Sequence, residues 1–227
     1  MPRRKNQKSG LSPAPAGSPD FSLEAEILEK FGDPVAGIDE AGRGPLAGPV
    51  VAAALILDPD AIPAGLNDSK KLNASRRSEL FEALCRSAHV SVAAASRARI
   101  DRTNIRQATL YAMRVALRGL SLTPACALID GRDVPNDLIC PGEAVVKGDA
   151  RSLSIAAASI VAKVTRDRMM DAAGLFYPGY GFEKHMGYGT AMHMQALEEL
   201  GACPLHRTTF RPVTNVIMGF EPDFEGN

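Results

Sequence analysis

The chain has 227 residues, of which 45% are hydrophobic and 23% charged, a balance that is ordinary for a globular protein with one full core. Lysine and arginine total 26, as do aspartate and glutamate, so net charge cannot attract a polyanion and a local basic patch would have to do so. Four scattered cysteines without a C-x-x-C pair and four histidines without metal-ligand spacing argue against a disulfide framework and a zinc site, and predict core or surface roles for both residue types.

The two ends of the chain are predicted to differ from the part between them. Residues 1–20 combine proline, serine, glycine and basic residues, which cannot bury enough apolar surface to become ordered, so we expect a disordered tail. Residues 21–220 are expected to form one domain, and residues 221–227 a flexible end. No stretch reaches the ~20 apolar residues that a membrane span requires, and no apolar signal core opens the chain. A cytoplasmic protein without a membrane partner is therefore expected.

The first half of the domain is predicted to alternate helices with strands. Apolar periodicity places these elements at residues 21–31 (helix), 35–38 (strand), 50–57 (strand), 73–88 (helix) and 89–95 (strand).

The loop over 58–73 contains Asp68-Ser69-Lys70-Lys71. Paired lysines are usually solvated, but a loop of this length in a compact domain is more often functional than idle.

The second half continues the alternation. Its predicted elements are a helix at 100–120, strands at 125–129 and 144–146, and helices at 152–173 and 191–201. Six arginines against one acid surround the first of these helices, and a solvated face and a phosphate-tracking face fit this pattern equally.

A glycine-rich loop over 176–190 concentrates three of the four tyrosines. These rings either pad the core or stack on a sugar or base. A segment over 203–215 with the basic pair His206-Arg207 follows the last predicted helix.

A charged tip follows the first predicted strand. Asp39 and Glu40 are adjacent, and neighbouring side chains of a strand point to opposite faces, so both can serve one site only if the backbone leaves strand geometry there. Gly42 and Gly44 permit such a departure, and Arg43 between them suits a phosphate. A polar turn between two core strands is the alternative, which an isolated Asp-Glu pair would favour. The glycine spacing matches neither a dinucleotide fingerprint nor a P-loop.

Two further acids stand at predicted strand ends. Asp130 and Asp149 each follow a short apolar strand, and sites in open α/β sheets gather at the carboxyl ends of strands. Asp-Gly after a strand is most often turn chemistry. The coincidence of Asp39, Asp130 and Asp149 at such ends nevertheless favours a site, with Asp167 as a reserve acid.

Several carboxylates without a nucleophilic Ser, Cys or His constellation favour hard divalent cations. Mg²⁺ and Mn²⁺ prefer oxygen ligands and share them with substrate phosphates. Two such ions about 4 Å apart can activate water and neutralise the leaving oxygen of a phosphodiester. Together with Arg43 and Lys70, the acids fit phosphodiester hydrolysis.

Seven segments, in the same order and spanning roughly Val35 to Val213, resemble bacterial ribonuclease HII. They are Gly-Ile-Asp-Glu-Ala-Gly-Arg-Gly-Pro-Leu-Ala-Gly-Pro-Val (37–50), Leu-Asn-Asp-Ser-Lys-Lys-Leu (66–72), Leu-Ile-Asp-Gly (128–131), Val-Val-Lys-Gly-Asp (145–149), Ala-Ala-Ser-Ile-Val-Ala-Lys-Val-Thr-Arg-Asp (157–167), Tyr-Gly-Phe (180–182) and His-Met-Gly-Tyr (185–188). The first segment is specific by itself. Its Gly-Arg-Gly triplet argues against the related ribonuclease HIII, which has a different loop there and an extra amino-terminal domain.

This resemblance implies a fold, an activity and a cofactor. The fold would be an α/β fold of the ribonuclease H-like type, with a mixed central sheet flanked by helices. The activity would be two-metal-ion hydrolysis, with Mn²⁺ or Mg²⁺, of the RNA strand of RNA–DNA hybrids, leaving 3′-hydroxyl and 5′-phosphate ends. The family also cuts 5′ of single ribonucleotides embedded in duplex DNA, so hybrids and such duplexes are the expected partners.

The resemblance also assigns catalytic residues. The four acids of the family fall on Asp39, Glu40, Asp130 and Asp149, of which the first three would be metal ligands. Asp149, aligned by Lys-Gly-Asp, thereby takes the place of Asp167.

Substrate-binding residues carry over in the same way. The triplet Gly42, Arg43 and Gly44 resembles the loop that senses the ribose 2′-hydroxyl, and Tyr188 resembles the tyrosine that packs on the following deoxyribose. Lys70 and Lys163 resemble phosphate contacts. Met186 departs from the lysine of many relatives, and we expect weaker binding from it without a change in chemistry.

Two other functions remain open on the sequence. A catalytically silent hybrid-binding protein of the same fold would not need all four acids, and metal-dependent nicking would exclude it. A small-molecule nucleotide phosphohydrolase should turn over free nucleotides and would not need Arg43 or Tyr188.

Overall fold

A computed structural model of the chain describes residues 18–219, which contain a five-stranded sheet in the spatial order β3-β2-β1-β4-β5. β1 pairs antiparallel with β2, and β2 with β3, whereas β1–β4 and β4–β5 are parallel, so the sheet is mixed as predicted. The strands are β1 (Val35–Ala41), β2 (Val50–Leu57), β3 (Ala88–Ala95), β4 (Cys126–Asp130) and β5 (Gly142–Val145).

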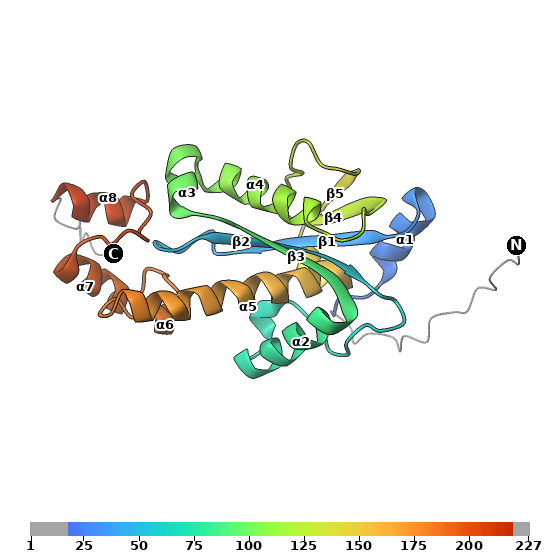
Figure 1. Cartoon of the computed structure of the whole chain (residues 1–227), viewed down its shortest axis with the longest axis horizontal. Coiled ribbons are helices and arrows are strands. Elements are labelled where there is room, and N and C mark those ends of the chain that lie inside the picture. The colour runs from blue at the N-terminus through green and yellow to red at the C-terminus, as the bar shows by residue number, and fades with distance from the viewer. Residues whose placement is uncertain (1–17, 220–227) are drawn as a thin grey trace, which may run out of the picture.

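Helices cover both faces of the sheet, which makes three layers (Figure 1). α4 packs on one face, and α5, with α2 beside it, packs on the other. α6, α7 and α8 gather at the opposite end of the molecule from α1. The helices are α1 (Ser22–Phe31), α2 (Ala74–Ser87), α3 (Arg97–Thr103), α4 (Ile105–Arg118), α5 (Leu153–Phe176), α6 (Phe182–His185), α7 (Ala191–Leu200) and α8 (Arg211–Met218), with single 3₁₀ turns η1 (Ser69–Lys71) and η2 (Gly148–Ala150).

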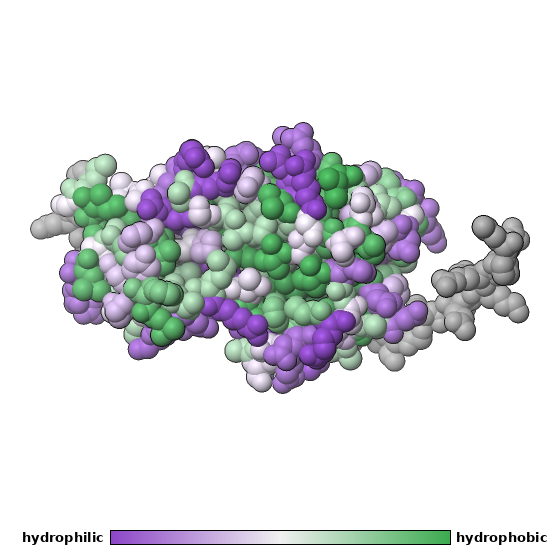
Figure 2. All heavy atoms as spheres, in the orientation of Figure 1, coloured by the Kyte–Doolittle hydropathy of each residue, from purple (hydrophilic) through white to green (hydrophobic). Residues whose placement is uncertain are grey.

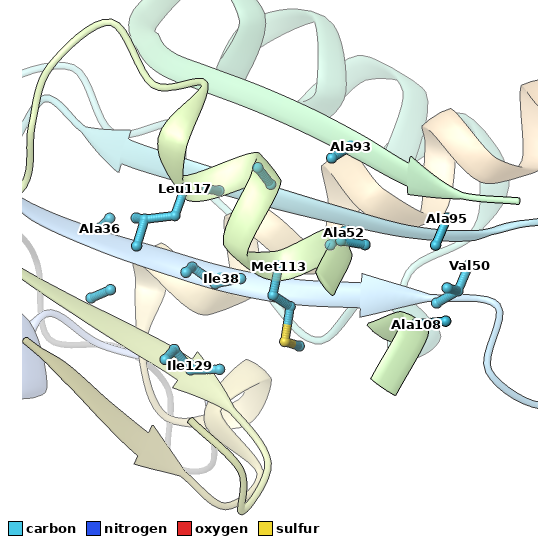
Figure 3. Packing of buried hydrophobic residues seen from close by; sticks show 14 of the residues in the cluster. Ala36, Ile38, Val50, Ala52, Ala93, Ala95, Ala108, Met113, Leu117 and Ile129 are labelled. Carbon is cyan, nitrogen blue, oxygen red and sulfur yellow. The ribbon is translucent and has the colours of Figure 1, made fainter. Parts of the chain in front are cut away.

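The core lies on both faces of β1 and β2, because all eight residues of β2 are buried. Alternate residues of these strands face α4, where Ile38 packs with Met113 and Leu117 (Figure 3). The other residues, such as Leu55, face α5 and α2. Burying one such side chain contributes about 1.5–3 kcal/mol, so the two clusters hold the helices on the sheet.

Gly37 lets α5 lie unusually close to β1. A Cβ atom at this position would overlap the main chain of Ser154 and Ile155 in the first turn of α5. The small residues Ala156, Ala157 and Ala158 that follow are fully buried against the sheet. Because Gly37 is two residues before Asp39, this close approach also fixes where β1 ends relative to α5.

The edge of the sheet at β3 is partly open to solvent. Figure 2 shows apolar residues across the middle of the face on which β3 lies, with hydrophilic residues along its rims. Val92 of this strand is 40% exposed. Within residues 18–219, no helix is long and apolar enough to cross a membrane.

Several element boundaries differ from the predicted ones. The helix predicted over 100–120 is two helices, because Asn104 has a φ of 124° and its side chain accepts the Gln107 N–H at the start of α4. α6 lies inside the predicted loop over 176–190, and α8 was not predicted as a helix.

The predicted disordered tail lies outside the described residues except for its last three positions. There Pro19 is buried and Asp20 bridges to Ser152, so this part of the tail prediction was wrong. The flexible end predicted over 221–227 lies outside the described residues.

Candidate active site

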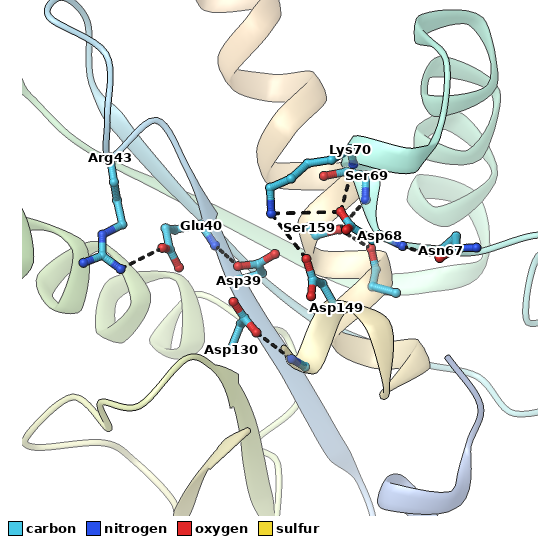
Figure 4. A network of polar contacts seen from close by, with 12 residues as sticks. Asp39, Glu40, Arg43, Asn67, Asp68, Ser69, Lys70, Asp130, Asp149 and Ser159 are labelled. Carbon is cyan, nitrogen blue, oxygen red and sulfur yellow. Dashed lines mark hydrogen bonds and ion pairs between the residues drawn. The ribbon is translucent and has the colours of Figure 1, made fainter. Parts of the chain in front are cut away.

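The parallel pairing of β1 with β4 brings two of the predicted acids together. Ile38 pairs with Ile129, so Asp39 and Asp130 are the next residues on neighbouring strands. Figure 4 shows both carboxylates on the same side of the sheet end, with Glu40 and Asp149 beside them. Four acids from three separate parts of the sequence therefore converge at one place.

The strand does not end at Asp39, contrary to the expectation that the backbone must leave strand geometry there. β1 continues to Ala41, and both Asp39 and Glu40 have partners in β2. The Asp39 side chain instead bends along the strand, where its Oδ1 accepts the main-chain N–H of Glu40 at 2.7 Å. The longer Glu40 side chain reaches Arg43, with 3.3 Å between Oε1 and Nη1. Side-chain flexibility, not a backbone kink, keeps the two acids together.

Asp130 and Asp149 are joined by the turn η2. The main-chain N–H of Gly148 donates to Asp130 Oδ1 at 2.7 Å, and a Cβ at Gly148 would crowd both Asp130 and Ile155. Asp149 is the next residue and is buried. Its Oδ2 lies 3.4 Å from Lys70 Nζ, which comes from the loop over 58–73. That loop thus reaches the site, as its length indicated.

Burial, followed by the charges of neighbouring acids, raises the pKa values of three of the acids. Burial, followed by the charges of Glu40 and Asp130, raises the pKa of Asp39 well above its ordinary value. Burial also raises the pKa of Glu40, against the opposing charge of Arg43. The pKa of Asp130 is raised by burial in spite of the Gly148 hydrogen bond. Closely placed buried carboxylates repel one another, so a divalent cation would be favoured here.

The donor chemistry fits Mg²⁺ or Mn²⁺, but the side chains are not yet in coordinating positions. Within residues 18–219, no three acids, histidines or cysteines form a complete metal-binding arrangement. Glu40, whose side chain is 12% exposed, is turned towards Arg43, whose side chain is 52% exposed. A cation that binds Glu40 would have to displace Arg43 from this carboxylate.

A cleft of about 220 Å³ joins the acids to the predicted substrate-binding residues. Asp39 and Glu40 lie at one side of it, and the other lining residues are Ala41, Gly42, Arg43, Gly44, Ser69, Lys70, Lys163, Arg166 and Tyr188. All six substrate-binding residues expected from the sequence therefore line one cleft. A smaller hollow shares Glu40 and Arg43 and continues past Asp130 to Arg106.

The Gly-Arg-Gly segment and the tyrosine turn are held against each other. A Cβ built on Gly44 would lie 3.7 Å from the Tyr188 ring. The Leu46 N–H donates to the Gly187 carbonyl at 2.8 Å, and Tyr188 is 46% exposed beside it. Met186, the departure from the family pattern, has a left-handed φ of 51°. The turn thus presents an aromatic face to the cleft.

Lys163 and the reserve acid Asp167 form a pair of their own. The Lys163 Nζ atom lies 2.7 Å from Asp167 Oδ1, one helical turn further along α5. Asp167 does not line the cleft that Asp39 and Glu40 line.

Two arginines of α4 form ion pairs with the loop after β4. Arg106 contacts Asp133 at 2.6 Å, and Arg114 contacts Asp137 at 3.2 Å. These pairs join α4 to that loop, and the choice between a solvated and a phosphate-tracking face stays a prediction.

Sequence reasoning missed two buried arginines and a histidine chain. Arg166 and Arg207 lie beneath the Gly-Arg-Gly segment. The Nδ1 atom of His206 accepts the main-chain N–H of Cys203 at 2.9 Å. The Nε2 atom of His206 lies 3.0 Å from Nε2 of His193. The Nδ1 atom of His193 lies 2.9 Å from the Tyr188 carbonyl oxygen. Because a main-chain N–H can only donate, His206 carries its proton on Nε2, and His193 donates to Tyr188. Spacing rules for metal ligands could not find this chain, because its members are joined to one another and to main-chain groups by hydrogen bonds.

Comparisons with known proteins give one consistent result. A sequence model of the family described as Ribonuclease HII matches residues 36–213. Ribonuclease HII of Rhizobium meliloti is 58% identical over 216 residues, covering 95% of this chain and all of that protein. Ribonuclease H2 of Pyrococcus horikoshii has a similar structure, with a TM-score of 0.72, 30% identity and coverage of 82% of this chain and 98% of that one. A ribonuclease HII of Archaeoglobus fulgidus, solved in complex with PCNA, has a TM-score of 0.67 at 28% identity and covers 78% and 94%.

Proposed function

The chain belongs to the ribonuclease HII family of endoribonucleases that act on RNA–DNA hybrids, and on this premise we propose that it also cuts 5′ of single ribonucleotides in duplex DNA. The products would be a 3′-hydroxyl and a 5′-phosphate. The observation that supports this proposal is the shared cleft, which Asp39 and Glu40 line together with the Gly-Arg-Gly segment and Tyr188. This arrangement supports a catalytic group and a sugar-reading group that act on one nucleotide.

The metal site would be held by Asp39, Glu40 and Asp130, with Asp149 beside them. Hard oxygen donors of this kind suit Mg²⁺ or Mn²⁺, and the family depends on divalent metal ions. When bound, two such cations would activate water for attack on the scissile phosphodiester and neutralise the leaving oxygen. Gly148 keeps the Asp130 carboxylate turned into the site by its hydrogen bond.

The sugar would be read by main-chain donors and an aromatic ring. A ribose 2′-hydroxyl both donates and accepts hydrogen bonds, and it is the group that distinguishes RNA from DNA. Gly44 and Arg43 are exposed at the cleft, next to the Tyr188 ring. Lys70 and Lys163 would contact the phosphates on the α5 side.

A cleavage assay on a duplex with one ribonucleotide tests the proposal. Nicking on the 5′ side of that nucleotide, only with Mg²⁺ or Mn²⁺, is expected, and an all-DNA duplex should stay intact. Binding without nicking would favour a silent hybrid-binding protein. Turnover of free nucleotides would favour a phosphohydrolase.

Two variants test the sugar-reading assignment. Tyr188→Ala and Arg43→Ala should each lower kcat/KM for the single-ribonucleotide duplex by about 10-fold or more, while Tyr188→Phe keeps the ring and most of the activity. Val92→Ala on β3 removes a similarly exposed side chain away from the cleft and serves as the control. Equal activity of Tyr188→Ala and the control would contradict this role.

A further inference from the structure

Two arginines are buried beneath the substrate-reading part of the cleft, and in the described part of the chain neither forms an ion pair within 4.0 Å. Arg166 is 1% exposed and Arg207 is fully buried, and they are among the largest fully buried side chains. Within residues 18–219, all their hydrogen-bond acceptors are main-chain carbonyl oxygens. A buried guanidinium normally pairs with a carboxylate, so this arrangement needs a reason.

Arg207 holds the first two residues of the Gly-Arg-Gly segment and the end of the turn that follows it. Its Nη2 donates to the Gly42 carbonyl at 2.6 Å and its Nη1 to the Arg43 carbonyl at 2.9 Å. Its Nε donates to the Gly48 carbonyl at 3.0 Å, and Nη2 also reaches Pro49. One rigid fork therefore fixes four carbonyls of a single loop.

Arg166 joins the same loop to the tyrosine turn. Its Nε donates to Pro49 and its Nη2 to Ala47, at 3.0 and 3.2 Å, while Nη1 donates to the Met186 carbonyl at 2.9 Å. Gly42, with φ +95°, packs directly on this side chain, and a Cβ there would overlap it. Because Met186 is two residues before Tyr188, the position of the ring is coupled to that of the loop.

The arginines bind carbonyl oxygens of residues 42–49, and some main-chain N–H groups of the same loop remain available for a ligand. The Leu46 and Gly48 N–H groups donate to Gly187 and Leu205. Among the described residues, the N–H groups of Gly42, Arg43 and Gly44 have no acceptor. These three donors belong to the segment that lines the cleft.

Two buried cations are costly for the fold. Burial, and then the charge of Arg166, lowers the pKa of Arg207 to about 9, so it remains charged at neutral pH. Replacing buried charges by apolar residues of similar volume is often neutral or stabilising. Stability alone therefore does not account for these residues.

We propose that Arg166 and Arg207 are positioning residues for ribonucleotide recognition, which hold the carbonyls of residues 42–49 inward and leave the N–H groups of the Gly-Arg-Gly segment facing the sugar. The inference rests on the proposed function, because it explains how the protein would distinguish a ribonucleotide from a deoxyribonucleotide. A lysine at either position keeps the charge, but its three donors share one nitrogen and cannot replace the planar fork whose separate nitrogens reach these carbonyls.

The test compares the duplex affinities of Arg207→Lys and the wild-type chain under conditions in which the duplex is not cleaved. With a chelator present, the Kd for an all-DNA duplex is divided by the Kd for the same duplex with one ribonucleotide. Arg207→Lys should lower this ratio about 10-fold, while Mn²⁺ affinity by calorimetry changes by less than about threefold. Leu84→Val, which loosens the buried core beside α2, controls for general destabilisation and should keep the ratio.

Each outcome decides between the two ideas. A wild-type chain without discrimination would remove the proposed function itself. Wild-type discrimination that persists in Arg207→Lys would overturn only the role of the arginines. If Arg207→Lys does not fold, Arg166→Lys is measured in the same way, and failure of both to fold would assign the pair to the fold and overturn the proposal.

Discussion

The Nζ atom of Lys70 lies 3.4 Å from a carboxylate oxygen of Asp149, a residue 79 positions further along the chain. The lysine side chain is 80% exposed, whereas that of Asp149 is 10% exposed, so an exposed cation reaches to the edge of a buried acid cluster. Burial opposes its charge, but the charges of Asp149 and Asp68 outweigh burial and raise the pKa of Lys70. The ammonium group of Lys70 is therefore positioned to contact a substrate phosphate without a rearrangement of its side chain.

Lys70→Gln should therefore weaken substrate binding in a salt-dependent way. Loss of one phosphate contact is expected to reduce the slope of log K against log salt by about 1. The neighbouring Lys71, exposed and outside the cleft, gives the matched control Lys71→Gln. Fluorescence anisotropy over a range of salt concentrations measures both slopes, and equal slopes would remove Lys70 from the phosphate path.

Asp130→Asn should abolish cleavage and leave the fold intact. The amide oxygen can still accept the Gly148 N–H, so the local structure is preserved while the charge of the proposed metal ligand is lost. We expect kcat to fall about 1,000-fold or more, with duplex affinity changed by less than about threefold. Asp137→Asn, whose side chain is 75% exposed, is the control. Near-normal turnover of Asp130→Asn would refute its assignment.

Asp39→Asn should make the metal-free protein more stable. The carboxylate is buried among other acids, and burial and their charges already raise its pKa, so removing the charge relieves repulsion. A gain of about 0.5–2 kcal/mol in the free energy of unfolding is expected, as for other substitutions that give up function for stability. Urea denaturation with a chelator measures it. In the wild type Mn²⁺ should raise the Tm, and this response should disappear in the variant.

Gly37→Ala should destabilise the fold by about 3 kcal/mol or more, because the added methyl group meets main chain that cannot move aside. Gly32→Ala is the informative comparison, since that position has φ +91° but open space around it. There only the backbone conformation is penalised, by about 1–2 kcal/mol. Chemical denaturation of the two variants separates the two effects, and equal losses would contradict close packing at Gly37.

His206 should make the protein sensitive to acid. Burial, then the neighbouring His193, lowers the pKa of His206 to about 4 in the folded state, against about 6.5 when unfolded. The unfolded chain binds the proton first, so this contribution to stability is present above pH 6.5 and is lost as the pH falls towards 4. The difference in unfolding free energy between the wild type and His206→Asn should shrink by up to about 3 kcal/mol over that range. A constant difference would contradict the neutral histidine chain.

The position of the acids at one end of the sheet was predictable, because short apolar segments typical of strands precede them in the sequence. Strands that finish at Asp130 and near Asp149 place their acids at one edge of the sheet, and the register of β1 with β4 confirms this neighbourhood. The path of Asp39 and Glu40 was not predictable, since a side chain that bends along its own strand leaves no periodic signal. The break at Asn104 was hidden for a similar reason, because the apolar pattern runs on across it.

The arginines were invisible to motif reasoning for a different reason. Arg166 and Arg207 bind main-chain oxygens, which every residue has, so no complementary acid marks their partners in the sequence. Likewise, nothing in the sequence indicated that two arginines of α4 pair with Asp133 and Asp137. Such partners are found only from contacts in space.

The hydrogen bonds that Arg207 donates to the loop all reach main-chain oxygens. The backbone conformation of the loop is therefore independent of the side chains that the loop presents to the cleft. Arg207 holds the oxygen of residue 43, while the side chain of that residue is 52% exposed. Position 43 can therefore accept other side chains without loss of the underlying shape. A library randomised at this codon would vary which sugars the protein prefers on an unchanged scaffold, and so offers a starting point for engineering new selectivity.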